Sequence, residues 1–231
     1  MLFQVELLRT IRQEKRPVSS QSIRVAIAYH SGYGHTAKQA DAVARGARSV
    51  PETQVTMIDV QDLADEHWRL LDGADAIVFG APTYMGGPSG VFKTFADATA
   101  AVWVEQRWRD KLAAGFTNSG HMQGDKLNTL VSFALLAAQH GMHWVNLGLK
   151  GGWDTSTGSP EDLNRLGGWL GAMAQSNKDQ GADVVPPSSD LRTAEALGRR
   201  VASVAHQYAR GRRAAQSSSP EVSPAVAASV E

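Results

Sequence analysis

Short apolar runs alternate with segments of helical spacing, and this alternation limits the fold more than any other feature of the chain. The expected strands, rich in β-branched residues or alanine, cover residues 23–29, 55–59, 76–81, 112–118 and 143–147. The expected helices cover residues 36–50, 89–101, 127–140 and 190–208. Strands that alternate with helices form a parallel sheet with right-handed crossovers. We therefore predict an α/β fold, a doubly wound five-stranded parallel sheet in a single domain with strand order 2-1-3-4-5.

The two ends of the chain lack this pattern. Residues 1–22 include Glu6 and Glu14 and have no long apolar run, so they do not look like a secretory signal. We predict an N-terminal extension at residues 1–22, one domain at residues 23–209 and a disordered C-terminal tail at residues 210–231. No run approaches the roughly 20 apolar residues of a membrane helix, and we expect a cytoplasmic protein without a membrane span.

Composition restricts the chemistry. The chain has no cysteine, so it can form neither disulfides nor thiolate nucleophiles, and redox chemistry would need a cofactor. Its 23 basic and 23 acidic residues give no net charge that would favour nucleic acid. The histidines near the fourth and fifth expected strands have no carboxylate at ligand spacing, so we predict no metal site.

The loop after the first expected strand has the composition of an anion-binding loop. Residues 30–36 read His-Ser-Gly-Tyr-Gly-His-Thr and lead directly into a helix. Free N–H groups and the helix dipole at such a junction favour an anion. Gly32 and Gly34 allow a close backbone approach, while Ser31 and Thr36 add hydroxyl donors. A phosphate monoester is the expected guest, and an ordinary strand–turn–helix junction is the alternative.

The same glycines also fit a second motif. Gly32, Gly34 and Ala37 match the dinucleotide fingerprint, and Asp59 ends the second expected strand where a ribose-binding acid would lie. A Rossmann dehydrogenase that binds NAD is therefore an alternative.

Two further loops have features of a site for a flat ring. Residues 81–90 leave the third expected strand at Pro82, present Tyr84 and Met85, and contain Gly86 and Gly87. Such a ring needs backbone groups along its edge and apolar side chains on its face. Residues 116–124 after the fourth expected strand are small and polar, which suits the far edge. Because loops at the carboxyl ends of parallel strands meet at the switch point, we expect the three loops to form one site, with plain surface turns as the alternative.

Five motifs in order give the chain a family resemblance. They lie at residues 29–36, 79–83, 93–97, 103 and 138–142, within a likeness that covers residues 23–207. Together they resemble the FMN-dependent NAD(P)H:quinone oxidoreductases of the tryptophan-repressor-binding-protein type, which are flavodoxin-like and similar to NADPH-dependent FMN reductases. The resemblance implies bound FMN, NADH or NADPH as electron donor, a quinone or other small acceptor, and a homodimer or homotetramer. Glycines near residues 167–171 resemble the family's long loop after strand five.

The resemblance also assigns site residues. It implies that the FMN phosphate is bound by Ser31, Tyr33, Gly34, His35 and Thr36. It implies that the isoalloxazine ring is bound by Pro82, Thr83, Tyr84, Met85, Gly86, Asn118, Ser119 and Gly120. His140 matches a family histidine that reaches the flavin, often from another subunit, and Trp103 matches an aromatic residue of the substrate pocket. His140 or Tyr84 is the expected proton donor to a quinone oxygen. The chain departs from the family at Tyr84, where arginine is usual, and at residues 118–121 and 169–170.

Two other functions remain as alternatives. A flavodoxin-type electron carrier would bind FMN but turn over no substrate, and its docking face would be strongly acidic, unlike this balanced chain. A degenerate fold that serves as an interaction module would not take up FMN at all.

Overall fold

The computed structural model describes residues 22–218, and a parallel sheet forms its centre. The strand order is β2-β1-β3-β5-β6, which in sequence order of the parallel strands is 2-1-3-4-5, so the predicted fold is confirmed. The strands are β1 (Ile23–Tyr29), β2 (Thr53–Asp59), β3 (Ala76–Tyr84), β4 (Gly87–Pro88), β5 (Leu112–Ser119), β6 (His143–Trp144) and β7 (Ala172–Gln175).

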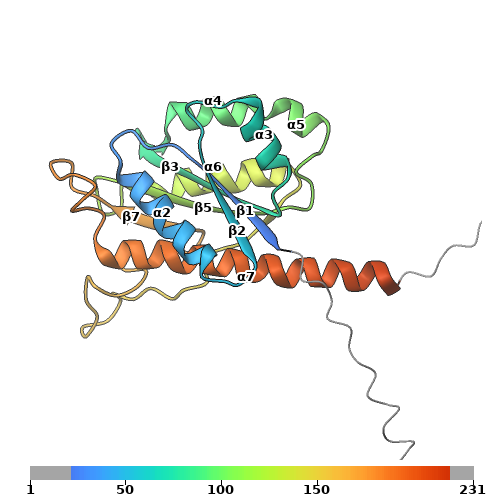
Figure 1. Cartoon of the computed structure of the whole chain (residues 1–231). Coiled ribbons are helices and arrows are strands. Elements are labelled where there is room, and N and C mark those ends of the chain that lie inside the picture. The colour runs from blue at the N-terminus through green and yellow to red at the C-terminus, as the bar shows by residue number, and fades with distance from the viewer. Residues whose placement is uncertain (1–21, 219–231) are drawn as a thin grey trace, which may run out of the picture.

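Helices cover both faces of the sheet, with α7 on one side and α3, α4 and α5 on the other (Figure 1). They are α2 (His35–Arg48), α3 (Asp65–Asp72), α4 (Gly90–Ala98), α5 (Ala100–Val104), α6 (Lys126–Gln139) and α7 (Ser188–Ser218). The helix predicted at residues 89–101 is thus two short helices. In the part of the chain that the structure describes, no helix is long and apolar enough to cross a membrane.

The apolar runs are buried because the central strands are covered on both faces. In β1, Val25 and Ile27 pack with α2 and α7, while Ala26 and Ala28 pack on the opposite side. This alternation divides the core into two clusters, and most of the buried aromatic residues lie in the one beneath α4 and α6. A strand buried on both faces has a nearly continuous apolar sequence; β1 is apolar apart from Arg24, and its bounds match the predicted strand.

The fifth strand differs from the prediction. Two short strands take the place of the fifth strand: β6 pairs with the start of β5, and β7 pairs with its end. Residues 145–171 connect β6 to β7. The expected strand at residues 143–147 is therefore wrong beyond Trp144. Two features hold the returning chain beside β5. Trp144 Nε1 donates a 2.9 Å hydrogen bond to the Leu170 carbonyl. The backbone of Gly171 lies so close to β5 that a Cβ there would be 2.1 Å from the Gly115 carbonyl oxygen.

The last helix is longer than predicted. It ends at Ser218, so residues 210–218 are helical and do not belong to a disordered tail, and its last turns project beyond the sheet (Figure 1). Arginine, alanine and glutamine are good helix formers and continue a helix that is already nucleated by packing. The guanidinium of Arg212 also lies 5.7 Å from the ring centre of Tyr208. The predicted N-terminal extension and the rest of the predicted tail fall on residues 1–21 and 219–231, which lie outside the described residues.

Candidate functional site

The first loop joins β1 to α2 at the carboxyl edge of the sheet. Gly34 begins the helix in the left-handed conformation, with φ 83°, and no side chain caps the helix there. Ser31 Oγ accepts a 3.0 Å hydrogen bond from the Ala37 N–H. Within residues 22–218, the N–H groups of Gly32, Tyr33 and Gly34 donate to no acceptor. Free N–H groups just before a helix start are the arrangement that an anion needs.

His30 fixes the first loop to the neighbouring elements. Its backbone N–H donates to the Gly80 carbonyl at 3.0 Å, and its Nδ1 lies 2.8 Å from the hydroxyl of Ser89, which caps α4. Burial lowers the pKa of His30, so the ring is neutral at pH 7. His30 stands within the predicted loop, but its role in joining the loop to α4 could not be predicted, because Ser89 lies 59 residues away in the chain.

The second loop is a β-hairpin. β3 continues through Pro82 to Tyr84 and pairs with β4 in antiparallel register, so the expected end of the strand at residue 81 is wrong. Pro82 is tolerated because its carbonyl, rather than an N–H, enters the pairing and accepts from the Ser89 N–H. Met85 and Gly86 form the turn with φ 49° and 82°, and the Met85 side chain is fully exposed. The exposed Met85 side chain at this tip could pack against the face of a flat aromatic ring.

Tyr84 lies over the first loop. Its ring meets Tyr33 edge to face with centres 6.5 Å apart, and its hydroxyl would lie 2.6 Å from a Cβ at Gly32. Burial, with a smaller contribution from Tyr33, raises the pKa of Tyr84, so the hydroxyl keeps its proton at neutral pH. Tyr84 thus connects the first and second loops, and its hydroxyl can act as a proton donor.

The third loop is held by the start of α6. Ser119 Oγ accepts a 2.7 Å hydrogen bond from Lys126 Nζ, and Asn128 Nδ2 donates to the Gly86 carbonyl at 2.6 Å. The Thr83 hydroxyl lies 2.8 Å from those of Thr117 and Thr129. One helix end therefore sets the spacing between the second and third loops. Lys126, Asn128 and Thr129 had no distinguishing signal in the sequence, because they are ordinary residues at a helix start.

A fourth segment, residues 176–182, completes the site and was not predicted. His35 Nε2 lies 2.9 Å from the Gln180 carbonyl oxygen, and a Cβ at Gly34 would lie 3.3 Å from that of Ala182. At the other end, the Ser176 N–H donates to the Ser119 carbonyl and its hydroxyl accepts from Asn118 Nδ2. The segment connects the first loop to the third. Its role follows from β7, which the sequence did not reveal.

His140 and Trp103 line one cavity, apart from the first and third loops. His140 follows α6 at the end opposite to Lys126, and 14 helical residues span about 21 Å. Its side chain is 1% exposed, its Nε2 lies 2.9 Å from the Thr99 hydroxyl, and burial lowers its pKa. Both residues line a cavity of about 630 Å³ between α4, α5 and α6, which Pro88 of the hairpin also lines. The structure therefore places His140 and Trp103 in one cavity that adjoins the hairpin at Pro88, whereas the first and third loops do not line it.

The strand order excludes the Rossmann alternative. In that fold the third strand lies beyond the second, whereas here β3 pairs with β1 on the side opposite to β2. Asp59 stands at the end of the edge strand β2, where its carboxylate accepts the Gln61 N–H at 3.0 Å. Asp59 therefore caps a turn, and β1 separates its strand from β3, so it does not border a site between β1 and β3.

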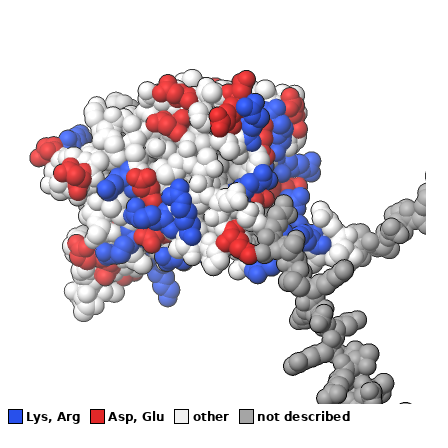
Figure 2. All heavy atoms as spheres, viewed as in Figure 1, with Lys and Arg blue, Asp and Glu red and all other residues white. Residues whose placement is uncertain are grey.

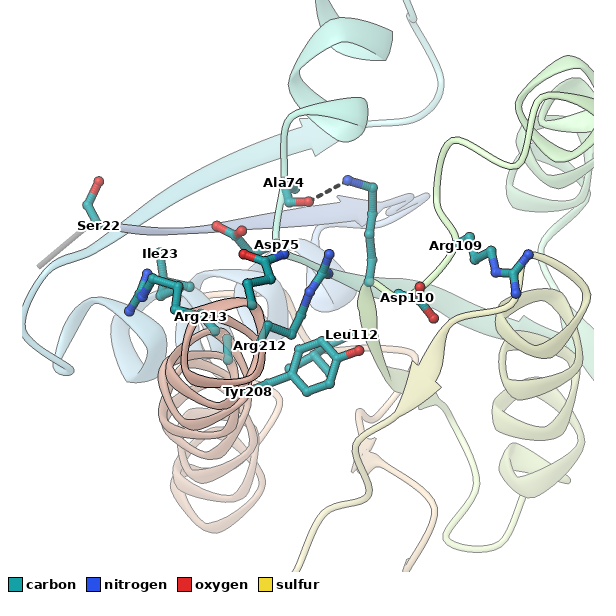
Figure 3. Close-up of a pocket in the computed structure, with 14 residues that line it drawn as sticks. Ser22, Ile23, Ala74, Asp75, Arg109, Asp110, Leu112, Tyr208, Arg212 and Arg213 are labelled. Carbon is teal, nitrogen blue, oxygen red and sulfur yellow. Dashed lines mark hydrogen bonds between the residues drawn. The ribbon is translucent and has the colours of Figure 1, made fainter. Parts of the chain in front are cut away.

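A separate cavity of about 380 Å³ lies at the opposite edge of the sheet (Figure 3). It is bounded by the first residues of β1 and β5 and by the last turns of α7, with Arg212 and Tyr208 among its walls. Lys111 Nζ donates to the carbonyls of Asp72 and Ala74 at 2.7 Å each. Because these are the amino ends of the strands, the cavity is not part of the site formed by the loops.

Comparison with known proteins finds one family and relatives named as flavodoxins and as quinone dehydrogenases. Residues 30–149 match the family described as NADPH-dependent FMN reductase. The chain is 42% identical over 187 residues to flavodoxin FldP of Pseudomonas aeruginosa, covering 80% of this chain and 97% of that protein. It is 31% identical over 222 residues to an NAD(P)H dehydrogenase (quinone) of Geotalea uraniireducens, covering 81% and 100%. A solved structure of a WrbA-like flavodoxin from Agrobacterium tumefaciens is 44% identical with a TM-score of 0.64, covering 81% of this chain and 99% of that one.

Proposed function

Because this chain belongs to the NADPH-dependent FMN reductase family, we propose that it is an FMN-dependent NAD(P)H:quinone oxidoreductase. The observation that carries the proposal is the meeting of a loop with free N–H groups and a hairpin with an exposed apolar tip at one edge of the sheet. When bound, FMN accepts a hydride from NADH or NADPH and passes two electrons to an acceptor. The family match confirms the family, the cofactor and the enzyme class predicted from the sequence.

The first loop is suited to the FMN phosphate. The N–H groups of Gly32, Tyr33 and Gly34, with the start of α2, would surround the phosphate without a basic side chain. His35 and Thr36 stand in the first turn of the same helix, which begins one residue before the predicted start at Thr36. Ser31 Oγ accepts the Ala37 N–H, which leaves the hydroxyl proton free to donate to a phosphate oxygen.

The second and third loops are suited to the ring. Met85 and Tyr84 would lie against its face, while backbone groups near Gly86 and Gly120 would follow its edge. The side chains of Thr83 and Asn118 are buried and already hydrogen-bonded, so they would support the loops rather than touch the ring. Pro82 is likewise buried in the sheet and would position the hairpin.

Tyr84 is the better placed of the two proposed proton donors. Its hydroxyl keeps its proton and lies beside the first loop, and it is part of the open surface of the site. His140 is buried behind Thr99, so the geometry of a single chain does not support its role in proton transfer. A role for His140 or Trp103 in the reaction would require a second subunit, which stays a prediction.

An apolar stripe supports the predicted homo-oligomer. On α6, Leu127, Val131 and Leu135 follow one another at helical spacing, and all three are exposed. Trp103 and Val104 on the nearby α5 are exposed as well. A second copy of the chain that covers this stripe would remove apolar area from water. The oligomeric state and the cytoplasmic location stay predictions.

Kinetics test the proposed function. We expect purified protein to be yellow, anaerobic NADH or NADPH to bleach its flavin absorbance without an acceptor, and turnover with a benzoquinone to be ping-pong. Asp59→Ala serves as a control, because Asp59 caps a turn and should leave the kinetics nearly unchanged. A yellow protein that NAD(P)H bleaches only when a partner reductase is added would contradict the proposal.

That last outcome would instead support the electron carrier, which the 42% identity to a flavodoxin favours. A carrier needs a charged docking surface for its partners. On the face shown in Figure 2, basic and acidic side chains are interspersed rather than separated. The match to the FMN reductase family and the relatives named NAD(P)H dehydrogenase (quinone) favour the reductase over the carrier.

A further inference from the structure

A buried lysine lies directly behind the third loop. Lys126 begins α6, its side chain is fully buried, and its Nζ donates to Ser119 Oγ at 2.7 Å and to the His121 carbonyl at 2.5 Å. Both acceptors are neutral. A buried ammonium normally requires a carboxylate, because neutral hydrogen bonds do not replace the water that it has lost.

The nearby carboxylate is already occupied. Arg165 binds both oxygens of Asp190 at 2.8 Å, and Asp190 also accepts the Gln175 N–H. Both members of this pair are almost completely buried. Lys126, Arg165 and Asp190 therefore leave one positive charge uncompensated beside the site. Burial lowers the pKa of Lys126 to about 8, Asp190 opposes that shift, and Arg165 adds to it.

The end of α6 that carries Lys126 contacts both loops between which the ring is proposed to lie. Lys126 holds Ser119 of the third loop, and Asn128 holds Gly86 of the second. The positive end of the helix dipole lies at the same place and has the same sign as the ammonium. A positive charge at a helix start is unfavourable by itself, so an anion in the site would relieve it.

We propose that Lys126 is a positioning residue whose buried ammonium makes the bound FMN easier to reduce. The inference rests on the proposed placement of the ring between the second and third loops. Hydride transfer moves two electrons and one proton from NADH or NADPH to the ring and leaves NAD(P)⁺, so the ring gains one negative charge. The uncompensated charge of Lys126 favours that product over the oxidised ring.

Redox titration of the FMN-loaded protein tests this inference. Lys126→Met should bind reduced FMN about tenfold more weakly relative to oxidised FMN, which lowers the two-electron midpoint potential by about 30 mV. Lys150→Met is the control, because it also removes one lysine charge, but Lys150 is exposed and lies between β6 and β7, outside the loops of the site. Solvent screens that charge, so its removal should change the ratio by less than about twofold.

The pH dependence gives a second measurement. In the wild type, reduction should raise the pKa of Lys126, so the midpoint potential should gain an extra dependence on pH above about pH 8. The other charged groups that face this ammonium are Asp190 and Arg165, which form an ion pair with each other. Lys126→Met should lose the extra dependence, and Lys126→Arg should keep a potential near that of the wild type.

An unchanged potential in FMN-loaded Lys126→Met would overturn the inference. If that variant did not fold, a wild-type potential with no added pH dependence above pH 8 would overturn it equally. These titrations use chemical reductant and reference dyes, with neither NAD(P)H nor quinone. A protein that fails as a quinone reductase can therefore still confirm the role of Lys126, and an active reductase can still refute it.

Discussion

Replacing Gly198 with alanine is expected to lower the free energy of unfolding by about 3 kcal/mol. Gly198 lies on α7, and a Cβ there would be 1.9 Å from the Val43 carbonyl oxygen on α2. The same close approach is seen from α2, where a Cβ at Gly46 would be 1.8 Å from the carbonyl oxygen of Glu195 on α7. Both contacts are with helix backbone, which cannot turn aside as a side chain can, so the two helices must separate. Chemical denaturation measures the loss.

Gly211→Ala is the matched control on the same helix. A Cβ there would meet no atom of the described chain within 4 Å, and alanine forms helix better than glycine by about 1 kcal/mol. This variant should therefore be as stable as the wild type or slightly more so. Equal denaturation midpoints for Gly198→Ala and Gly211→Ala would show that α2 and α7 do not pack through these glycines. Because α2 carries the first loop at its start, Gly198→Ala should also weaken FMN binding.

The sheet could be predicted because its strands are buried on both faces. The first six residues of β3 form a continuous apolar run, and β1 is apolar apart from the exposed Arg24; a run of that length between turn signals has few other solutions. The short strands were missed for the opposite reason. β7 has only four residues, two of them only partly buried, and it becomes a strand through pairing with β5. Nothing local in its sequence distinguishes it from loop.

The candidate site was predicted in part for a related reason. The three loops follow strands that could be predicted, so their meeting at one edge followed from the topology. The residues that hold the loops were missed, because their contacts join positions far apart in the chain. His35 meets the carbonyl of Gln180, and His30 meets Ser89. His140 was assigned by resemblance alone, and the structure places it at the far end of α6.

Gly32→Asp is expected to reduce the affinity for FMN by a factor of about 100 to 1,000. Gly32 stands in the loop whose N–H groups are proposed to hold the phosphate. Two unit charges 4 Å apart repel by about 4 kcal/mol near a protein surface, and the phosphate carries more than one. Gly32 does not have the positive φ that glycine alone accepts readily, so the backbone admits a side chain. Fluorescence titration of FMN into the apoprotein measures the dissociation constant.

Gly32→Asn separates charge from size. Asparagine has nearly the shape of aspartate, and either side chain would displace the Tyr84 hydroxyl, which lies 2.6 Å from the Cβ position. Moving the end of one flexible side chain costs about 1 kcal/mol, so Gly32→Asn should weaken FMN binding by only about fivefold. The additional loss in Gly32→Asp is then the repulsion between two negative charges, and it should shrink as salt is added. Equal dissociation constants for the two variants would mean that the phosphate does not lie in this loop, and the ring would then have to be placed elsewhere as well.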